Sequence, residues 1–364
     1  MPSTSNTQRP AAPAPGAAAP SATPAPAKST DPLFNPNLPT NLELLQNNTS
    51  ILPAPSAAKL SNRHKPNPQT LPTIPPPAPP RDGTRSYPAP NRAIVQVVIP
   101  TANKGKVDLL VGHLRRTKPA GVTIAGHTEV PADSGVGEQP YDGAGPRGAF
   151  RRVVAAVRKL GGDGEYRARL AARGVGTLLV ASVENFLARE EEIVGAAAGT
   201  GRVGGAVPVD YGVVVFCRVD LVGGETAPPP PWVWRVGVSR GVTAPAEYWR
   251  AAEAFGFEDQ AREHGRVTVG ELLAANIPGL DKADWHKVLA GVSRYELLGE
   301  AMRAMEAELP WPAAEGAARA GGAPVLSRKL SISVLPLVLG SHLMATAYAV
   351  AERATDLNVR EWRD

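Results

Sequence analysis

The 364-residue chain has a single cysteine, Cys217, which excludes a disulfide bond within the chain. Its six histidines show no metal-ligand spacing, and with only one thiol the sequence offers no structural zinc site. No apolar core follows the first charges at the N-terminus, so we expect no secretory signal. Cys217 lies in the apolar run YGVVVFCRVDLV, and we expect a buried thiol in a protein of a reducing compartment.

The folded part of the chain also lacks a strong excess of charge of either sign. The formal charge is +5, from 39 basic and 34 acidic side chains. Residues 1–90 carry seven of the basic and three of the acidic side chains, which leaves 32 and 31 for the rest. This nearly neutral remainder contains no stripe of basic residues with interleaved aromatics. We therefore expect no nucleic-acid partner.

Proline is abundant but confined. Residues 1–90 hold 22 of the 38 prolines and show almost no helical or alternating apolar pattern. Such a segment buries too little apolar surface to offset its ordering entropy, and its prolines favour the extended polyproline II helix. We predict a disordered proline-rich region over residues 1–91, a folded domain over 92–312, and a C-terminal extension over 313–364.

The sequence PPPAPPR at residues 75–81 contains a P-x-x-P-x-R pattern formed by Pro76, Pro79 and Arg81. A polyproline II helix places the two prolines on one face for an aromatic groove, and the arginine sets direction against an acidic residue of an SH3-type partner. A segment this rich in proline also produces the pattern by chance, and the Pro75–Pro77 triplet would suit other domains that bind polyproline. The prediction is a proline-rich arm that recruits proteins.

Strands and helices are interspersed in the folded part. Apolar runs predict strands at 93–100, 121–126, 176–183, 210–222 and 232–238. Helical spacing of apolar residues predicts helices from about Val107 through Leu114, and at 150–160, 245–255, 268–276 and 284–309. This order implies a mixed α/β (α+β) fold, with a sheet flanked by helices.

The stretch TANKGKVDLL at residues 101–110 connects the first predicted strand to a helix N-terminus. Free backbone N–H groups and the helix dipole favour an anion at such a terminus, so Thr101, Asn103 and Lys106 are candidate phosphate-binding residues. A helix cap is the alternative role for Asn103. For Lys106 the alternative is a solvated residue of the first turn.

Three motifs, in order, resemble the inosine/xanthosine triphosphatase-like family. They are T-x-N-x-x-K (Thr101, Asn103, Lys106), SGVGEQP at 134–140 followed by RGAFRR at 147–152, and V-x-x-V-E ending at Glu184. The resemblance spans about residues 94–310 and implies a twisted sheet with a long central cleft. It also implies a phosphate cradle at the first motif and a candidate catalytic carboxylate at Glu184, at the end of the central strand.

The same resemblance leaves the metal site in question. Mg²⁺ on a triphosphate needs several carboxylates, and the only acid where that family has an acidic cluster is Asp142, which with Glu184 would form the metal site. Asn185 and Phe186 stand where that family has glycines, and a phenyl ring would fill space that a ligand needs. We therefore lean against an enzyme and expect no cofactor; Mg²⁺ enters only if the hydrolase interpretation holds.

A closer resemblance is to the proline-rich and coiled-coil-containing protein family. It is carried by SVENFLA at 182–188, TVGELL at 268–273 and ADWHKVLAGVSRYELLGEAMRAM at 283–305, behind a proline-rich leader. It implies a pseudoenzyme on a degenerate triphosphatase-like fold: a homodimer in the cytoplasm, at the Golgi or ER exit sites, that binds the regulatory subunit of cyclic-AMP-dependent protein kinase. The alternative is a Mg²⁺-dependent inosine or xanthosine triphosphate phosphatase. From the residues themselves, we expect Trp285 to be a packing or partner contact and His286, near a helix start, to be an interface residue.

Residues 332–351 carry no formally charged side chain over 20 positions, which is long enough to span a bilayer. Pro336, Gly340 and His342 make this segment a poor membrane span. We favour a buried or partner-docked helix, with membrane contact as the alternative.

Overall fold

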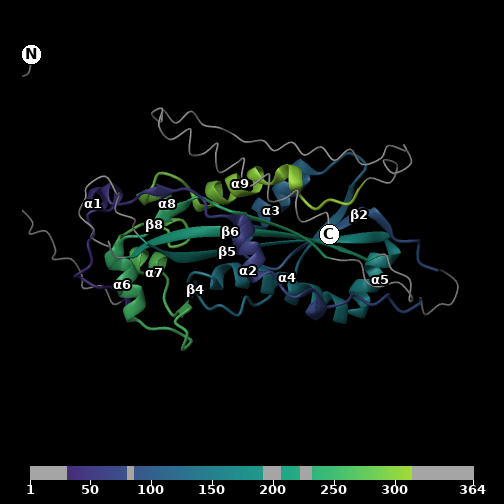
Figure 1. Ribbon diagram of the computed structural model, residues 1–364, viewed down its shortest axis with the longest axis horizontal. Helices are drawn as coiled ribbons and strands as arrows, with labels where there is room; N and C mark the ends of the chain where they lie inside the picture. The colour runs from purple at the N-terminus through teal and green to yellow at the C-terminus, as the bar shows by residue number, and fades with distance from the viewer. Residues whose placement is uncertain (1–30, 80–85, 192–205, 222–231, 314–364) are drawn as a thin grey trace, which may run out of the picture. The chain divides into compact units, whose positions relative to one another are not determined.

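The computed structural model describes residues 31–79, 86–191, 206–221 and 232–313 (Figure 1). Its centre is a seven-stranded mixed sheet in the order β1-β8-β6-β5-β2-β3, with β7 paired to β6. The strands are β1 (Ile51–Leu52), β2 (Asn91–Ile99), β3 (Thr123–Glu129), β5 (Val175–Glu191), β6 (Ala206–Asp220), β7 (Val233–Val238) and β8 (Gly241–Thr243). β2 runs parallel to β3 and β5, and the other pairings are antiparallel. The predicted mixed α/β class is confirmed.

Helices cover both faces of this sheet (Figure 1). They are α1 (Leu42–Asn47), α2 (Ala57–His64), α3 (Lys104–Thr117), α4 (Ala144–Gly162), α5 (Gly164–Ala172), α6 (Ala246–Ala254), α7 (Val269–Asn276), α8 (Trp285–Leu289) and α9 (Arg294–Ala304). Side chains of α3 and α9, such as Leu110 and Met302, share one core cluster with Val97 of β2. Phe150 of α4 packs in a second cluster with Val180 of β5. Alternation along the strands thus divides the core between the two faces.

A third hydrophobic cluster closes one end of the sheet, where α1, α6, α7 and α8 gather (Figure 1). Tyr248 and Trp285 are among its largest fully buried side chains. Close by, β4 (Gln139–Pro140) and β9 (His264–Gly265) form a separate two-stranded sheet. Because this end is assembled from residues 38 to 297, it depends on contacts far apart in the sequence.

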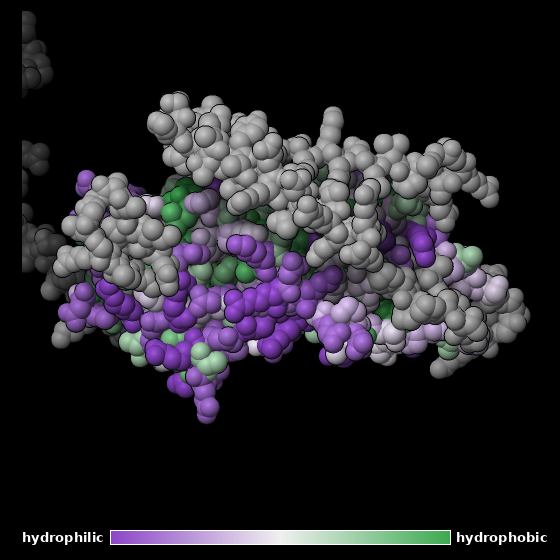
Figure 2. Space-filling model, in the orientation of Figure 1, coloured by the Kyte–Doolittle hydropathy of each residue, from purple (hydrophilic) through white to green (hydrophobic). Residues whose placement is uncertain are grey.

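The segment from residue 31 to 79 differs from the expected disorder. Leu38 and Leu45 are buried in the third cluster, and Leu52 of β1 packs against the core cluster on the α4 face. Side chains of Asn41 and Ser56 cap α1 and α2. The prediction was wrong here because a few isolated apolar side chains suffice when the surface that buries them is built by other segments. Figure 2 shows a hydrophilic surface over α2, whose sequence is AAKLSNRH.

The helix predicted over 284–309 is broken. It forms α8, a turn at residues 290–293, α9 and a final 3-10 turn η2 (Glu306–Glu308). Gly291 adopts a positive φ of 71° in the turn, and Ser293 then caps α9 in a capping box with Glu296. The Ser-x-x-Glu signature marks a new helix start inside what looked like one apolar pattern.

The apolar segment 332–351 lies outside the described residues. The residues that the structure describes all belong to one compact unit. Within the described part of the chain, no helix is long and apolar enough to cross a membrane.

Candidate functional site

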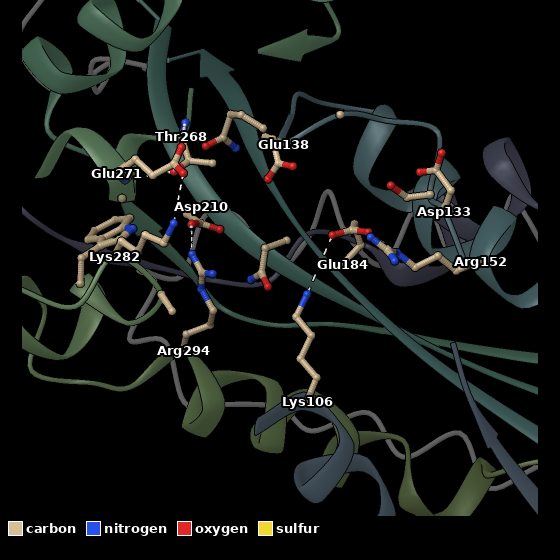
Figure 3. A pocket seen from close by; sticks show the side chains of 17 residues that line it. Lys106, Asp133, Glu138, Arg152, Glu184, Asp210, Thr268, Glu271, Lys282 and Arg294 are labelled. Atoms are coloured by element: carbon tan, nitrogen blue, oxygen red, sulfur yellow. Dashed lines mark hydrogen bonds and ion pairs between the residues drawn. The ribbon is translucent and has the colours of Figure 1, made fainter. Parts of the chain in front are cut away.

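A polar cavity lies where β5 runs past the end of its neighbour β2. The pairing of β2 with β5 ends at Val98 and Val180, whereas β5 continues to Glu191. Beyond Val180, the next backbone pairing on this edge of β5 is a β-bridge between Leu187 of β5 and Tyr141. A cavity of about 390 Å³ lies at this crevice, in the position where α/β sheets commonly bind ligands (Figure 3). Its charged lining comprises Lys106, Asp133, Glu138, Arg152, Glu184, Asp210, Glu271, Lys282 and Arg294.

Glu184 lies in this crevice between two basic side chains from opposite faces of the sheet. Arg152 Nε of α4 donates a hydrogen bond to Glu184 Oε2 at 2.8 Å. Lys106 Nζ of α3 is 4.0 Å from Glu184 Oε1. Glu184 is 8% exposed. Burial lowers the pKa of Lys106, and the opposing attraction of Glu184 does not restore it. The carboxylate is therefore neutralised by the protein itself.

Asp210 of β6 has a similar environment on the other side of the cavity. Its Oδ2 accepts a hydrogen bond from Arg294 Nη2 at 3.1 Å and lies 3.2 Å from His286 Nε2. Burial alone would raise the pKa of Asp210, but the charge of Arg294 and the hydrogen bonds from Arg294 and His286 outweigh it and lower that pKa. Asp210 is thus a buried carboxylate held ionised by its neighbours.

The remaining acids of the cavity differ in their pairing. Glu271 closes a capping box with Thr268 at the start of α7, and its Oε1 lies 3.2 Å from Lys282 Nζ. Asp133 Oδ1 accepts a hydrogen bond from the backbone of Gly135. Within the described residues Glu138 has neither hydrogen bond nor ion pair through its side chain, and Figure 3 shows its carboxylate between Glu271 and Glu184. Three of the five acids are therefore matched by bases in the same cavity.

Two residues that line the cavity each carry an acceptor atom that lacks a donor within the described residues. Asn185 Oδ1 and Asp210 Oδ1 are buried and have no hydrogen-bond partner in the described part of the chain. A buried acceptor without a donor is costly, so a bound molecule that carries N–H or O–H groups would be stabilised here. The lining is suited to a small polar ligand with both donor and acceptor groups.

The TANKGK turn contributes one residue to the cavity lining, and its other predicted site residues form the start of α3. Asn103 is the N-cap of α3, where its Oδ1 accepts from the backbone N–H of Lys106 at 3.0 Å. Thr101 Oγ1 accepts in turn from the backbone N–H of Asn103 at 3.1 Å. The helix-cap alternative for Asn103 is confirmed. Of the three predicted phosphate-binding residues, Lys106 alone lines the cavity, and it is partly buried beside Glu184 rather than solvated.

Asp142 is not brought together with Glu184. Its carboxylate binds Arg189 of β5 through both the side chain, at 2.7 Å, and the backbone N–H, at 2.9 Å. Arg189 also contacts Glu253 of α6 at 3.0 Å. Asp142 does not line the cavity. The two carboxylates proposed for Mg²⁺ therefore serve two separate ion-pair networks.

β5 also corrects two expectations about the residues after Glu184. The strand does not end at Glu184 but continues to Glu191. Phe186 does not fill the cavity, because its side chain turns to the α4 face and packs directly over Gly145. Asn185, on the opposite side of the strand, is the residue that lines the cavity.

Trp285 and His286, predicted to contact a partner, are each 1% exposed. Their rings stack at 3.9 Å between centroids, and only Trp285 lines the cavity. Asp284 is the N-cap residue of α8, but its side chain makes no capping hydrogen bond; its carboxylate accepts from Ser293 Oγ and the backbone of Arg294, both at 2.7 Å. Both aromatic residues thus have structural positions inside the domain.

The proline motif lies away from the cavity, beside α5. The carbonyl of Pro76 accepts a hydrogen bond from Arg167 Nη1, while Pro79 is exposed. Arg81 lies outside the described residues.

Several cavity residues were not singled out from the sequence. Arg152 was visible within RGAFRR, and Glu138 within SGVGEQP, because both belong to motifs already quoted. Asp210 and Arg294 are 84 positions apart, and no local pattern indicates that they meet.

The fold and the cavity define a mixed α/β protein with a polar, mixed-charge pocket where β2 ends and β5 continues alone. No protein-family model matches the chain, and no curated protein matches it. Among solved structures it is similar to the crystal structure of protein VC0702 from Vibrio cholerae. The match has 12% sequence identity and a TM-score of 0.34, and covers 57% of this chain and 91% of the other. Similarity at this level assigns the chain to no family.

Proposed function

We propose that the protein is a non-enzymatic regulatory or adaptor protein built on a degenerate triphosphatase-like fold. The observation that carries this proposal is the position of Glu184 between Arg152 and Lys106. A magnesium-bound triphosphate needs carboxylate oxygens that are free to bind the ion and cations that are free to bind phosphate. In this cavity the same side chains already neutralise one another.

Asp210 supports the same conclusion. Its Oδ2 is engaged by both Arg294 and His286, and Asp142 is held elsewhere by Arg189. Within the described residues, the group of His, Asp and Glu side chains close enough to share a metal ion is Asp259, Glu263 and His264, which does not line the cavity. Among the described residues of the cavity we therefore find no preassembled metal site for fast hydrolysis.

A phosphate-release assay tests this proposal. Purified full-length protein is incubated with inosine, xanthosine and guanosine triphosphates in the presence of Mg²⁺, beside the Glu184→Gln and Glu138→Gln variants. We expect release at the buffer rate for all three proteins. Turnover above that rate in the wild type that is lost in Glu184→Gln would refute the proposal.

The alternative is a Mg²⁺-dependent inosine or xanthosine triphosphate phosphatase. The observation in its favour is that Glu138 and Asp210 Oδ1 offer oxygen atoms without a protein partner in the described chain, within one cavity. In that case Lys106 would bind phosphate and Glu184 would exchange a basic partner for Mg²⁺. The assay above separates the two functions.

The resemblance to the proline-rich and coiled-coil-containing family extends the proposal to partners and location. A homodimer in the cytoplasm, at the Golgi or ER exit sites, would bind the regulatory subunit of cyclic-AMP-dependent protein kinase and recruit further proteins through its proline-rich arm. Light scattering on a size-exclusion column tests the dimer. Titration with the purified regulatory subunit tests the interaction, and the absence of binding at micromolar concentrations would remove it.

A further inference from the structure

A proline-rich strap, residues 71–79, lies against α4 and α5. Leu71 and Ile74 pack against the core cluster on this face, which includes Tyr166 and Leu170 of α5. Arg167 Nη1 donates hydrogen bonds to the carbonyl oxygens of Pro75 and Pro76, both at 3.1 Å. The strap is therefore held by apolar contacts at one end and by backbone hydrogen bonds in the middle.

From residue 74 to residue 79, burial along the strap repeats every three residues. Ile74 and Pro77 are partly buried, and the pairs Pro75–Pro76 and Ala78–Pro79 between and after them are exposed. Before this stretch, Leu71 and Pro72 are both partly buried and Thr73 is exposed. Three residues per turn is the period of the polyproline II helix, which has three edges. Over residues 74–79 the domain contacts one edge and leaves the other two in solvent.

We propose that the domain presents this strap as a preformed ligand for an aromatic-groove domain of the SH3 type. Such a groove receives proline side chains from two neighbouring edges of a polyproline II helix, so the third edge is free to rest on another surface. Here the edge that contains Pro77 is the one that the domain occupies. Pro76 and Pro79, with the residues before them, remain available. This inference rests on the adaptor half of the proposed function.

Arg167 is the positioning residue of this surface. Its two hydrogen bonds fix the carbonyls of Pro75 and Pro76 and thereby the rotation of the strap about its own axis. A ligand already held in its bound conformation loses less conformational entropy on binding. The full-length protein should therefore bind an SH3 domain at least as tightly as a free peptide of the same sequence.

Thiol labelling tests the orientation of the strap without any partner. Cys217 is the only cysteine in the chain and is fully buried, so an introduced cysteine is the accessible thiol in the native protein. Pro76→Cys and Pro79→Cys should react with a maleimide on the order of tenfold faster than Ile74→Cys and Pro77→Cys, because local opening must precede reaction at the inner edge. Equal rates at all four positions would overturn the proposal.

Arg167→Ala provides the matched perturbation, with Arg169→Ala on the same helix as control. Arg169 is exposed and pairs with Glu165 within α5. In Arg167→Ala the difference in labelling rate between the outer and inner positions should shrink, and in Arg169→Ala it should persist. A general loss of stability would accelerate labelling at all four sites and is thereby distinguished. An undiminished difference in Arg167→Ala would contradict the positioning role.

Recognition itself is tested with purified SH3 domains that bind P-x-x-P-x-R peptides. Each is titrated by calorimetry with the full-length protein and with a peptide of residues 65–85. The proposal is supported if the protein binds the SH3 domain at least as tightly as the peptide does. This binding should be lost in Pro79→Ala and should survive in Pro77→Ala. Binding by the peptide alone would show that the domain masks the motif, and binding by neither would show that it is no ligand. Both results overturn the proposal.

These outcomes are separate from those of the phosphate-release assay. Nucleotide turnover together with SH3 binding would refute the non-enzymatic function and leave the presented strap intact. Absence of both would leave a pseudoenzyme whose proline-rich strap has no such partner.

Discussion

Arg152 Nε and Glu184 Oε2 are joined by a 2.8 Å hydrogen bond that crosses from α4 to the free edge of β5. Lys106 approaches the same carboxylate from α3 on the other face of the sheet. Glu184 thus connects the two helical layers at the point where β2 has ended. The carboxylate that the sequence predicted as a metal ligand is a structural ion-pair partner in this fold.

Replacing this carboxylate should therefore destabilise the fold. Glu184→Gln leaves two partly buried cations without their counter-charge, and we expect a loss of about 1–3 kcal/mol in the free energy of unfolding. Glu138→Gln, in the same cavity but without a partner in the described chain, should change it by less than about 0.5 kcal/mol. Urea denaturation at pH 7 measures both. Equal effects would show that the Glu184 pairs contribute nothing to stability.

Stability should fall as the pH drops below about 6.5, the ordinary pKa of histidine. Burial lowers the pKa of His286 in the folded state, although Asp210 opposes this. His286 therefore takes up a proton at a higher pH in the unfolded chain than in the folded one. The contribution of the neutral ring to the free energy of unfolding is fully present above about pH 6.5 and is lost as the pH falls below that value. His64 and His113, whose pKa burial also lowers, add to the slope.

The comparison of slopes checks this assignment. Between pH 7.5 and 5.5, His286→Gln should lose less stability than the wild type, whatever its absolute stability. An unchanged slope in His286→Gln would show that the ring does not titrate differently on folding.

Asn103 should act through its cap. Asn103→Ala removes the acceptor for the backbone N–H of Lys106, and we expect a loss of about 0.5–2 kcal/mol in the free energy of unfolding. Asn103→Asp retains an acceptor at the N-cap and should remain within a few tenths of a kcal/mol of the wild type. Thermal denaturation of the two variants measures the difference. A stable Asn103→Ala variant would mean that the cap is dispensable.

The N-terminal segment should contribute to global stability. Leu45 is 3% exposed in the cluster at the end of the sheet, whereas its neighbour Leu44 is 51% exposed. Leu45→Ala should cost about 2–5 kcal/mol and Leu44→Ala less than about 0.5 kcal/mol. Chemical denaturation of the full chain provides the measurement. If the two neighbours behaved alike, α1 would not be docked as the structure shows.

Elements with a strong local pattern were predictable. The β-branched runs of β2, β6 and β7 and the spacing of Val107, Leu110 and Leu114 in α3 appear where the sequence predicted them. The helix cap at Asn103 was one of two stated alternatives. The break at Ser293 was readable in principle from its capping-box signature, but the continuous apolar pattern concealed it.

Contacts between distant segments were not predictable. Leu38 and Leu45 stand in a proline-rich region with little apolar periodicity, and they are buried only because α6, α7 and α8 provide the surface. The partners of Asp210, His286 and Arg294, lie 76 and 84 positions away in the sequence. The local patterns around both residues predict only helices and give no sign of a contact with Asp210.

Periodicity, capping and composition are local properties, so the amino-acid pattern was enough to predict the class of the fold and most strands and helices. Which charges meet in the cavity, and which edge of the proline strap is free, could be seen only once the chain had folded. Ion pairing and burial depend on which surfaces are brought into contact, and one carboxylate in the same local sequence can bind a metal or an arginine according to what folds beside it.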